Sequence, residues 1–215
     1  MPGWLNSIQF SRMKILVFSD IHGDWRALGR LLETEADLYF SAGDLTSWER
    51  GLAEGGRILA QRGERVYVLP GNHESAAAVQ AMCDRFGLNF FHERSFKTGG
   101  YHFAGLGYSS PTPFNTPGEY SEEEIAERLE RFAALKPLVL VCHCPPRGTP
   151  LDRVRDGVHA GSSAVARFIE LHQPALFFSG HIHEAAGVQA KLGCTRAFSA
   201  GPRGLLFDFD KIEAV

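Results

Sequence analysis

The chain has 215 residues and a formal net charge of −3, with 44% hydrophobic and 22% charged residues. This composition is typical of a folded globular protein, and it excludes the strongly basic surface on which nonspecific nucleic-acid binding depends. No apolar run approaches the about 18 residues that a membrane helix needs, so no membrane association is expected. A small anionic substrate stays compatible with the charge, because a bound metal can reverse the local field.

Residues 1–12 contain neither the basic leader nor the apolar segment of a secretory signal, and we therefore expect a cytoplasmic protein. Met13 directly precedes the first apolar run. Residues 1–12 are thus predicted to be a disordered extension or to lie ahead of the true translation start. No low-complexity linker or repeat divides residues 13–215, which are predicted to form a single domain.

Apolar runs rich in Val, Ile, Leu and Phe recur along the chain without alternation, which is typical of strands buried on both faces. They occupy residues 14–19, 37–42, 65–70, 137–143 and 175–180. Amphipathic helical patterns separate them, at residues 24–35, 75–85, 121–135 and 162–172. Asp24 and Ser162 are predicted helix N-caps, and Ser121 with Glu124 forms a predicted capping box. Strands alternating with helices predict a largely parallel sheet.

Shorter β segments are predicted in two further regions, at residues 88–93, 101–107, 195–201 and 204–210. They indicate a second sheet with antiparallel pairing, packed face to face with the first and with helices outside. Residues 108–120, "YSSPTPFNTPGEY", follow the first of these two regions and are rich in Pro and Ser. A loop of this length in a compact domain is commonly functional or disordered, and this one could cover a site.

"CHC" at residues 142–144 resembles a metal cluster at first sight. In a strand, however, Cys142 and Cys144 point to the face opposite His143. We therefore expect the two thiols to pack in a core and only the imidazole to be available as a ligand. The absence of a C-x-x-C pair and the cytoplasmic setting argue against disulfides.

Polar side chains of one kind follow each of the five long strands. They are Asp20 and His22; Asp44; Asn72, His73 and Glu74; His143; and His181 and His183. A lone histidine or aspartate at such a position is usually a structural residue or a turn former. The carboxyl ends of parallel strands meet at one edge of a sheet, where ligands bind in open α/β folds. The joint pattern therefore predicts one site rather than five separate turns.

Carboxylate, amide and imidazole groups without thiolates suit divalent ions of intermediate hardness, such as Mn²⁺, Fe²⁺ or Zn²⁺, better than Ca²⁺. The donors are too many for one tetrahedral ion, whereas two ions that share a carboxylate would use them all. A two-metal site of this kind indicates phosphoryl transfer, which depends on positioning and charge stabilisation.

The motifs and their order resemble the calcineurin-like metallophosphoesterase superfamily. Its pattern D-x-H … G-D … G-N-H-[DE] … H … G-H-x-H is matched by residues 20–22, 43–44, 71–74, 143 and 180–183. The resemblance extends over most of the chain from Met13 onward. It implies an α/β fold, the four-layer α/β/β/α sandwich of two mixed sheets flanked by helices, in agreement with the two sheets predicted above.

The resemblance also implies a role for each site residue. Asp20, His22 and His183 would hold one metal ion, and Asp44 would bridge it to the other. The ligands of the second ion would be Asn72, His143 and His181. We expect two divalent ions, with manganese favoured and iron or zinc compatible.

His73 would contact the phosphate and protonate the leaving oxygen. Glu74 stands where many members have Asp, and would orient His73 and raise its basicity. The alternative for Glu74 is a capping acid at the start of the helix at residues 75–85. Arg147 could bind a phosphate oxygen bidentately or be a solvated surface group. Asp152 and His159 could shape the same pocket.

Subfamily features narrow the resemblance. The second block, "GDLTSWERG", lacks the Asp-Arg pair of the protein Ser/Thr phosphatases, and the chain lacks the extra domains of the repair nucleases. Residues 143–162 resemble small prokaryotic predicted phosphoesterases.

The sequence thus predicts hydrolysis of a phosphodiester or phosphomonoester of a small molecule or nucleotide, by in-line attack of a metal-bridging hydroxide. The alternative is a non-catalytic metal-binding scaffold on the same fold. The oligomeric state stays open.

Overall fold

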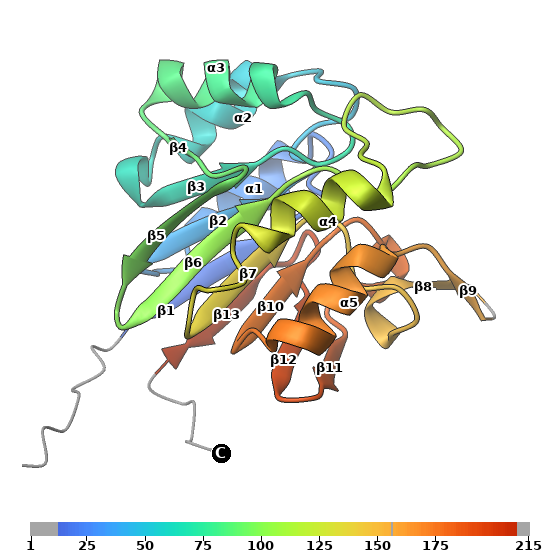
Figure 1. Ribbon diagram of the computed structural model, residues 1–215. Coiled ribbons are helices and arrows are strands. Elements are labelled where there is room, and N and C mark those ends of the chain that lie inside the picture. The colour runs from blue at the N-terminus through green and yellow to red at the C-terminus, as the bar shows by residue number, and fades with distance from the viewer. Residues whose placement is uncertain (1–12, 156, 210–215) are drawn as a thin grey trace, which may run out of the picture.

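The computed structural model describes residues 13–155 and 157–209, so the prediction made for residues 1–12 lies outside the described residues. Two sheets form the centre of the molecule (Figure 1). The first has the strand order β13–β1–β2–β3–β4. Its strands are β1 (Lys14–Phe18), β2 (Leu38–Ala42), β3 (Val66–Leu69), β4 (Asn89–Phe90) and β13 (Leu205–Asp208). β1 to β4 run parallel, and β13 is antiparallel to β1.

The second sheet has the order β11–β12–β10–β7–β6–β5. Its strands are β5 (Arg94–Thr98), β6 (Tyr101–Leu106), β7 (Leu138–Cys142), β10 (Leu176–Ser179), β11 (Gln189–Leu192) and β12 (Thr195–Ser199). A separate hairpin pairs β8 (Arg153–Arg155) with β9 (Val158–His159). Short 3₁₀ turns occupy Gly63–Arg65, Pro150–Asp152 and His183–Ala185.

Helices cover the outer face of each sheet. The first sheet is covered by α1 (Trp25–Leu32), α2 (Leu52–Leu59) and α3 (Ala76–Phe86), and the second by α4 (Glu122–Glu130) and α5 (Ser163–His172) (Figure 1). Alternate residues along a strand point to opposite faces of its sheet and pack in different hydrophobic cores. Val17 and Phe40 pack between the sheets, Leu16 and Tyr39 face α1 to α3, and Leu140 faces α4 and α5. The expected four-layer α/β/β/α architecture is confirmed.

The antiparallel pairing predicted for the second sheet is wrong at its centre. β6, β7, β10 and β12 pair in parallel, and only the edge strands β5 and β11 are antiparallel to their neighbours. β6, β7 and β10 are parallel because helices connect them: α4 links β6 to β7, and α5 lies between β7 and β10. A helical crossover returns the chain so that the next strand runs in the same direction. β4 and β13, also predicted in the second sheet, belong to the first, whereas β7 and β10, predicted in the first sheet, belong to the second.

The predicted helix starts agree with the structure. Asp24 and Ser162 accept hydrogen bonds from the backbone N–H groups of Ala27 and Val165, and Ser121 forms the expected capping box with Glu124. α4 ends at Glu130, earlier than predicted. The sequence pattern does not predict α2, because its sequence "LAEGGRIL" contains two glycines, which disfavour a helix. In the described part of the chain no helix has the length and apolar character needed to cross a membrane.

Candidate metal centre

All seven predicted metal ligands meet at the carboxyl ends of the parallel strands, where the two sheets adjoin. Asp20 and His22 follow β1, Asp44 follows β2, and Asn72 follows β3; His143 follows β7, and His181 and His183 follow β10. Four ligands thus come from the first sheet and three from the second. Their donor atoms lie close enough together to hold metal ions in groups, as described below.

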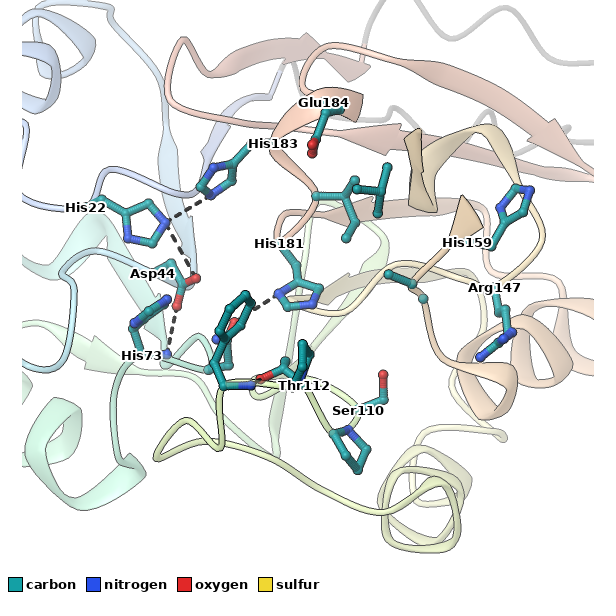
Figure 2. A pocket seen from close by; sticks show the side chains of 18 residues that line it. His22, Asp44, His73, Ser110, Thr112, Arg147, His159, His181, His183 and Glu184 are labelled. Carbon is teal, nitrogen blue, oxygen red and sulfur yellow. Dashed lines mark hydrogen bonds and ion pairs between the residues drawn. The ribbon is translucent and has the colours of Figure 1, made fainter. Parts of the chain in front are cut away.

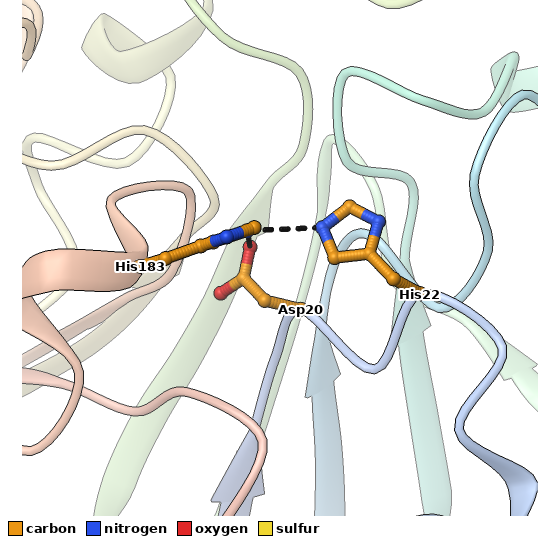
Figure 3. Close-up of side chains that lie close together, drawn as sticks. All are labelled: Asp20, His22 and His183. Atoms are coloured by element: carbon orange, nitrogen blue, oxygen red, sulfur yellow. Dashed lines mark hydrogen bonds and ion pairs between the residues drawn. The ribbon is translucent and has the colours of Figure 1, made fainter.

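The first group consists of Asp20, His22 and His183, whose donor atoms lie within 4.8 Å of one another (Figure 3). The Nε2 atoms of His22 and His183 are 3.0 Å apart, and His183 Nε2 is 3.6 Å from Asp20 Oδ1. Ser47 fixes the other ring nitrogen of His22, with its Oγ 3.0 Å from His22 Nδ1. The contact with Ser47 leaves His22 Nε2 facing the group. Metal-binding histidines commonly have such a hydrogen-bond partner on the other ring nitrogen.

The second group consists of Asp44, His143 and His181, with Asn72 beside them. Asn72 Oδ1 lies 3.1 Å from His143 Nε2 and 2.9 Å from His181 Nδ1. His143 donates its Nδ1–H to the carbonyl oxygen of Ala42 at 2.8 Å, which fixes the tautomer and leaves Nε2 as the available donor. The four side chains therefore present two imidazole nitrogens, a carboxylate and an amide oxygen to one point.

Asp44 lies between the two groups. Its Oδ2 is 3.7 Å from His22 Nε2 in the first group and 3.5 Å from His143 Nε2 in the second. Its Oδ1 accepts a hydrogen bond from the backbone N–H of His73. This is the position that a carboxylate shared by two ions must occupy.

The backbone at several of these residues is strained. Asp20, His22, Asp44 and His181 have φ between 47° and 73°, in the left-handed region. Non-glycine residues pay about 1–2 kcal/mol for this conformation, and such strain concentrates at functional sites. Here the left-handed turn directly after each strand brings the side chain back over the strand end, toward the other ligands.

Gly71 allows the loop after β3 to pack against Asp44. A Cβ atom at this position would collide with Asp44 Oδ1 and with the Asp44 backbone nitrogen. The loops after β2 and β3 can therefore touch only because residue 71 has no side chain. This explains the glycine of the G-N-H motif by close approach, since Gly71 does not have a positive φ.

Two buried carboxylates dominate the electrostatics of the site. Burial disfavours the charge of Asp44, but His143, the backbone N–H of His73 and the charge of His22 together outweigh it and hold the pKa of Asp44 well below its ordinary value. Burial likewise opposes the ionised form of Asp20, and the hydrogen bond to His183 and the charge of His143 still lower its pKa. Burial would lower the pKa of His143, yet the charge and hydrogen bond of Asp44, with the charge of Asp20 and the carbonyl of Ala42, raise it to about 9. For His181, burial and His143 together lower the pKa to about 4.

The ionised carboxylates therefore favour a positive charge in the site, which a divalent cation would supply. Oxygen and nitrogen donors without thiolates, held by fixed tautomers, fit divalent ions of the Mn²⁺, Fe²⁺ and Zn²⁺ type. The residues present thus fit the predicted metal centre.

Glu74 makes different contacts from the ones expected. Its carboxylate is fully buried and accepts hydrogen bonds from the backbone N–H groups of Asp44, Thr46 and Gly71, and from the Thr46 hydroxyl. The described contacts include none with the His73 ring, and the N-cap of α3 is Ser75. Glu74 therefore joins the loops after β2 and β3. Burial, followed by repulsion from Asp44, raises the pKa of Glu74 to about 7.

His73 lies beside both metal-binding groups. Its ring packs edge-on against His22 and Trp48, with centroid distances of 5.1 Å and 5.6 Å. One ring nitrogen comes within 4.8 Å of donor atoms of His22 and Asp44. Its Nδ1 is buried and has no hydrogen-bond partner among the described residues. A buried polar atom without a partner is costly, and such unpartnered groups concentrate at functional sites.

A cavity of about 610 Å³ opens onto the metal centre. Figure 2 shows His22, Asp44 and His73 at one end and Arg147 and His159 at the other. Residues 110–114 of the predicted loop line the cavity between them, with Phe114 73% exposed.

Arg147 thus lies at the cavity but apart from the metal ligands, and its side chain is exposed. His159 is anchored by Asp152, which is fully buried and lies 2.6 Å from His159 Nδ1. Asp152 also accepts hydrogen bonds from the backbone of Gly148, Thr149 and Gly161, so it organises the turn that bears Arg147. All three residues were predicted near the pocket, whereas Ser47, the partner of His22, carries no motif and was not predicted.

The four cysteines are free. Cys142 and Cys144 are buried in the core beneath α4 and α5, on the face of the second sheet opposite the metal centre. The expectation that only His143 of the "CHC" stretch faces the site is consistent with this arrangement.

Comparison with known proteins identifies the family. The family model of the calcineurin-like phosphoesterases matches residues 13–185, and the chain belongs to this family. The uncharacterized protein MJ1162 of Methanocaldococcus jannaschii is 34% identical over 198 residues, which cover 89% of each chain. The family is metal-dependent, and the site described above contains the corresponding groups of candidate ligands.

Solved structures share the fold. TT1561 of Thermus thermophilus superimposes with a TM-score of 0.70 at 21% identity, covering 92% of this chain and 98% of that one. The phosphopantetheinyl hydrolase PptH of Mycobacterium tuberculosis gives 0.64 at 17% identity, with coverage of 90% and 92%. A dimetal phosphatase from Danio rerio gives 0.61 at 11% identity, with coverage of 88% and 87%.

Proposed function

We propose that this protein is a phosphoesterase with a dinuclear metal centre, which hydrolyses a phosphodiester or phosphomonoester of a small molecule or nucleotide in the cytoplasm. The observation that carries the proposal is the position of Asp44, whose carboxylate lies between two complete groups of ligands. Asp20, His22 and His183 would hold one ion, and Asn72, His143 and His181 the other. Manganese suits this donor set, and iron or zinc would also fit it.

Two divalent ions in such a site supply a hydroxide nucleophile at neutral pH and neutralise the charge on the phosphate oxygens. The protein's own residues would do the rest. His73 would bind a phosphate oxygen or the leaving oxygen through its ring and protonate the leaving group. The cavity would enclose the organic part of the substrate between residues 110–114 and Arg147, which would contact a further anionic oxygen.

The alternative function is a non-catalytic scaffold that binds metal on the same fold. A scaffold has no need for His73, whose ring lies beside His22 and Asp44. The presence of this residue together with every expected ligand favours the enzyme.

The test is hydrolysis of a p-nitrophenyl phosphodiester and the corresponding monoester by metal-stripped protein, with and without added Mn²⁺. Activity should depend on Mn²⁺ and disappear with excess chelator. The double variant Asp20→Asn/His181→Asn, which loses one ligand from each group, sets the background from contaminating phosphatases. Activity that survives complete chelation would contradict the metal mechanism, and inactivity toward every ester in a broader panel would favour the scaffold.

A further inference from the structure

Asn72 uses both ends of its side-chain amide. Its Oδ1 faces the imidazoles of His143 and His181, at 3.1 Å and 2.9 Å. Its Nδ2 donates a hydrogen bond to the hydroxyl oxygen of Thr116 at 3.2 Å. An amide can rotate by half a turn at little intrinsic cost, and only one of the two orientations presents an oxygen to a cation. The partner of Nδ2 therefore decides whether Asn72 is a metal ligand.

Thr116 is oriented by a carboxylate behind it. Its hydroxyl donates to Glu119 Oε1 at 2.5 Å, and its backbone N–H donates to the same oxygen at 2.8 Å. Burial would raise the pKa of Glu119, but the hydrogen bonds from Thr112 and Thr116 outweigh it and lower that pKa. The ionised carboxylate can only accept, so the Thr116 hydroxyl must donate toward Glu119 and offer its lone pairs to Asn72. The two hydrogen bonds thus form a relay with one donor-to-acceptor direction, from Asn72 through Thr116 to Glu119.

Backbone hydrogen bonds hold the loop that bears this relay against Asn72. Gly118 donates its N–H to the carbonyl oxygen of Asn72 at 2.9 Å. Ser109 donates to Gly118, and Tyr120 donates to Ser109, so the two ends of the loop at residues 108–120 are joined beside Asn72. Thr116 and Asn72 are 7% and 3% exposed, which shields the contact from competing water.

We propose that Thr116 is a positioning residue: held by Glu119, it fixes the Asn72 amide with Oδ1 toward His143 and His181 and so sets the affinity of the second cation site. The inference rests on the dinuclear centre proposed above. It also assigns the loop a second role, because the same segment that lines the cavity through residues 110–114 holds a metal ligand in place.

The variant Thr116→Val tests the proposal, because it keeps the shape of the side chain and removes the hydroxyl. Binding of Mn²⁺ to metal-free protein is measured by calorimetric titration, without substrate. Loss of such an outer partner typically weakens metal binding about 10–100-fold. We expect this loss at one of the two sites, with the other unchanged, because Asp20, His22 and His183 do not contact Thr116. Thr116→Ser should restore wild-type affinity.

Thr112→Val is the matched control, since Thr112 donates to the same Glu119 oxygen at 2.6 Å but forms no described contact with Asn72. It should leave both Mn²⁺ affinities unchanged. Wild-type affinities in Thr116→Val would overturn the proposal, as would equal weakening of both sites or an equal effect of Thr112→Val, since these indicate a general role in loop folding. Thermal unfolding of each metal-free variant confirms that it folds.

The outcome is separable from that of the proposed function. If the wild-type protein binds two Mn²⁺ ions but hydrolyses no ester, the proposed function fails and the role of Thr116 can still be confirmed from the affinities. If the wild-type protein binds fewer than two ions, both proposals are overturned.

Discussion

His73 is held by its backbone and by neighbouring rings rather than by a hydrogen bond to its side chain. Its N–H donates to Asp44, and its ring lies edge-on to His22 and Trp48. This fixes the ring next to the metal centre without committing Nδ1, which has no partner among the described residues. In the proposed mechanism, the ring would contact the substrate from this position.

Replacing His73 by alanine should leave two metal ions bound, because His73 is not one of the proposed ligands. Turnover should fall by a factor of about 10² or more, since general acid catalysis contributes this much. The loss should be smallest for p-nitrophenolate, a leaving group that needs no proton. Steady-state kinetics with a series of leaving groups, together with metal analysis, measures both effects. A fully active variant on an alkyl ester would contradict the acid role.

Asp44→Asn should instead reduce metal content, because one carboxylate serves both groups of ligands. An amide has no charge and can offer only one oxygen, so we expect at most one ion per chain. Elemental analysis after reconstitution with Mn²⁺ measures the content. Glu54→Gln, on the exposed face of α2, is the control and should bind two ions. Two ions at wild-type affinity in Asp44→Asn would contradict the bridge.

The sequence predicted which residues would meet at the site but not all of their supports. Motif spacing was sufficient to predict that the seven candidate ligands and His73 lie close together, because each follows a strand whose end is fixed by the sheet. The contacts of Glu74 with Asp44 and Thr46 could not be predicted, since they depend on how closely two loops approach each other. Thr116 lies 44 residues from Asn72 in a stretch of loop without periodicity, so no local signal pointed to it.

At the scale of the elements, the loop at residues 108–120 is a fixed wall of the cavity. Tyr108 accepts a hydrogen bond from the backbone N–H of Ala76, and Tyr120 donates one to Glu93. Between these anchors, Glu119 accepts hydrogen bonds from Thr112 and Thr116. Residues 110–114 of the loop line the cavity, and the Phe114 side chain is exposed there.

His92, beneath this loop, makes stability depend on pH. Its Nδ1 accepts a hydrogen bond from the backbone N–H of Gly107 at 2.9 Å, and its Nε2 lies 3.2 Å from the Tyr120 hydroxyl. Protonation of Nδ1 would break the first contact. Burial, assisted by Arg128 and opposed by Glu93, lowers the pKa of His92 to about 4.

The folded protein therefore binds this proton less readily than the unfolded chain, whose histidine titrates near 6.5. The stability that His92 contributes is complete above that value and is lost as the pH falls toward 4. Between pH 7 and pH 4.5 the loss should be about 2–3 kcal/mol. Urea unfolding of metal-free wild type and His92→Asn measures it, since asparagine can accept the Gly107 bond but cannot titrate. Equal pH slopes in the two proteins would contradict the assignment.

At the scale of the whole molecule, the metal centre spans the edge where the two sheets adjoin. The first sheet provides Asp20, His22, Asp44 and Asn72, and the second provides His143, His181 and His183. Bound cations would therefore link the two sheets in addition to the apolar core between them.

Removing the metals should lower thermal stability. A site loaded at 100 times its Kd contributes about 2.7 kcal/mol, which for a domain of this size corresponds to a change in Tm of about 5–10 °C. Thermal unfolding with Mn²⁺ and with chelator measures the difference. The double variant Asp20→Asn/His181→Asn is the control and should show little response. An identical Tm for loaded and stripped wild type would show that the cations do not link the sheets.

The architecture was predictable because buried strands and capped helices alternate along the chain. The pairing within the second sheet was not, because the direction of β6 and β12 depends on how the chain connects them to β7 and β10 and not on their own sequence. α2 was missed for a local reason: Gly55 and Gly56 weaken its intrinsic helix preference, and its packing against α3 stabilises it instead.

One consequence concerns the alternation along β7. His143 has sulfur on either side of it, yet Cys142 and Cys144 enter the hydrocarbon layer under α4 and α5. A slip of β7 by a single residue would exchange the imidazole for a thiol and convert an oxygen-and-nitrogen centre into one that attracts thiophilic ions such as cadmium. The parallel strands β6 and β10 pair with β7 on both sides and keep it in register. The same pairing therefore also determines which kind of metal ion the centre would bind.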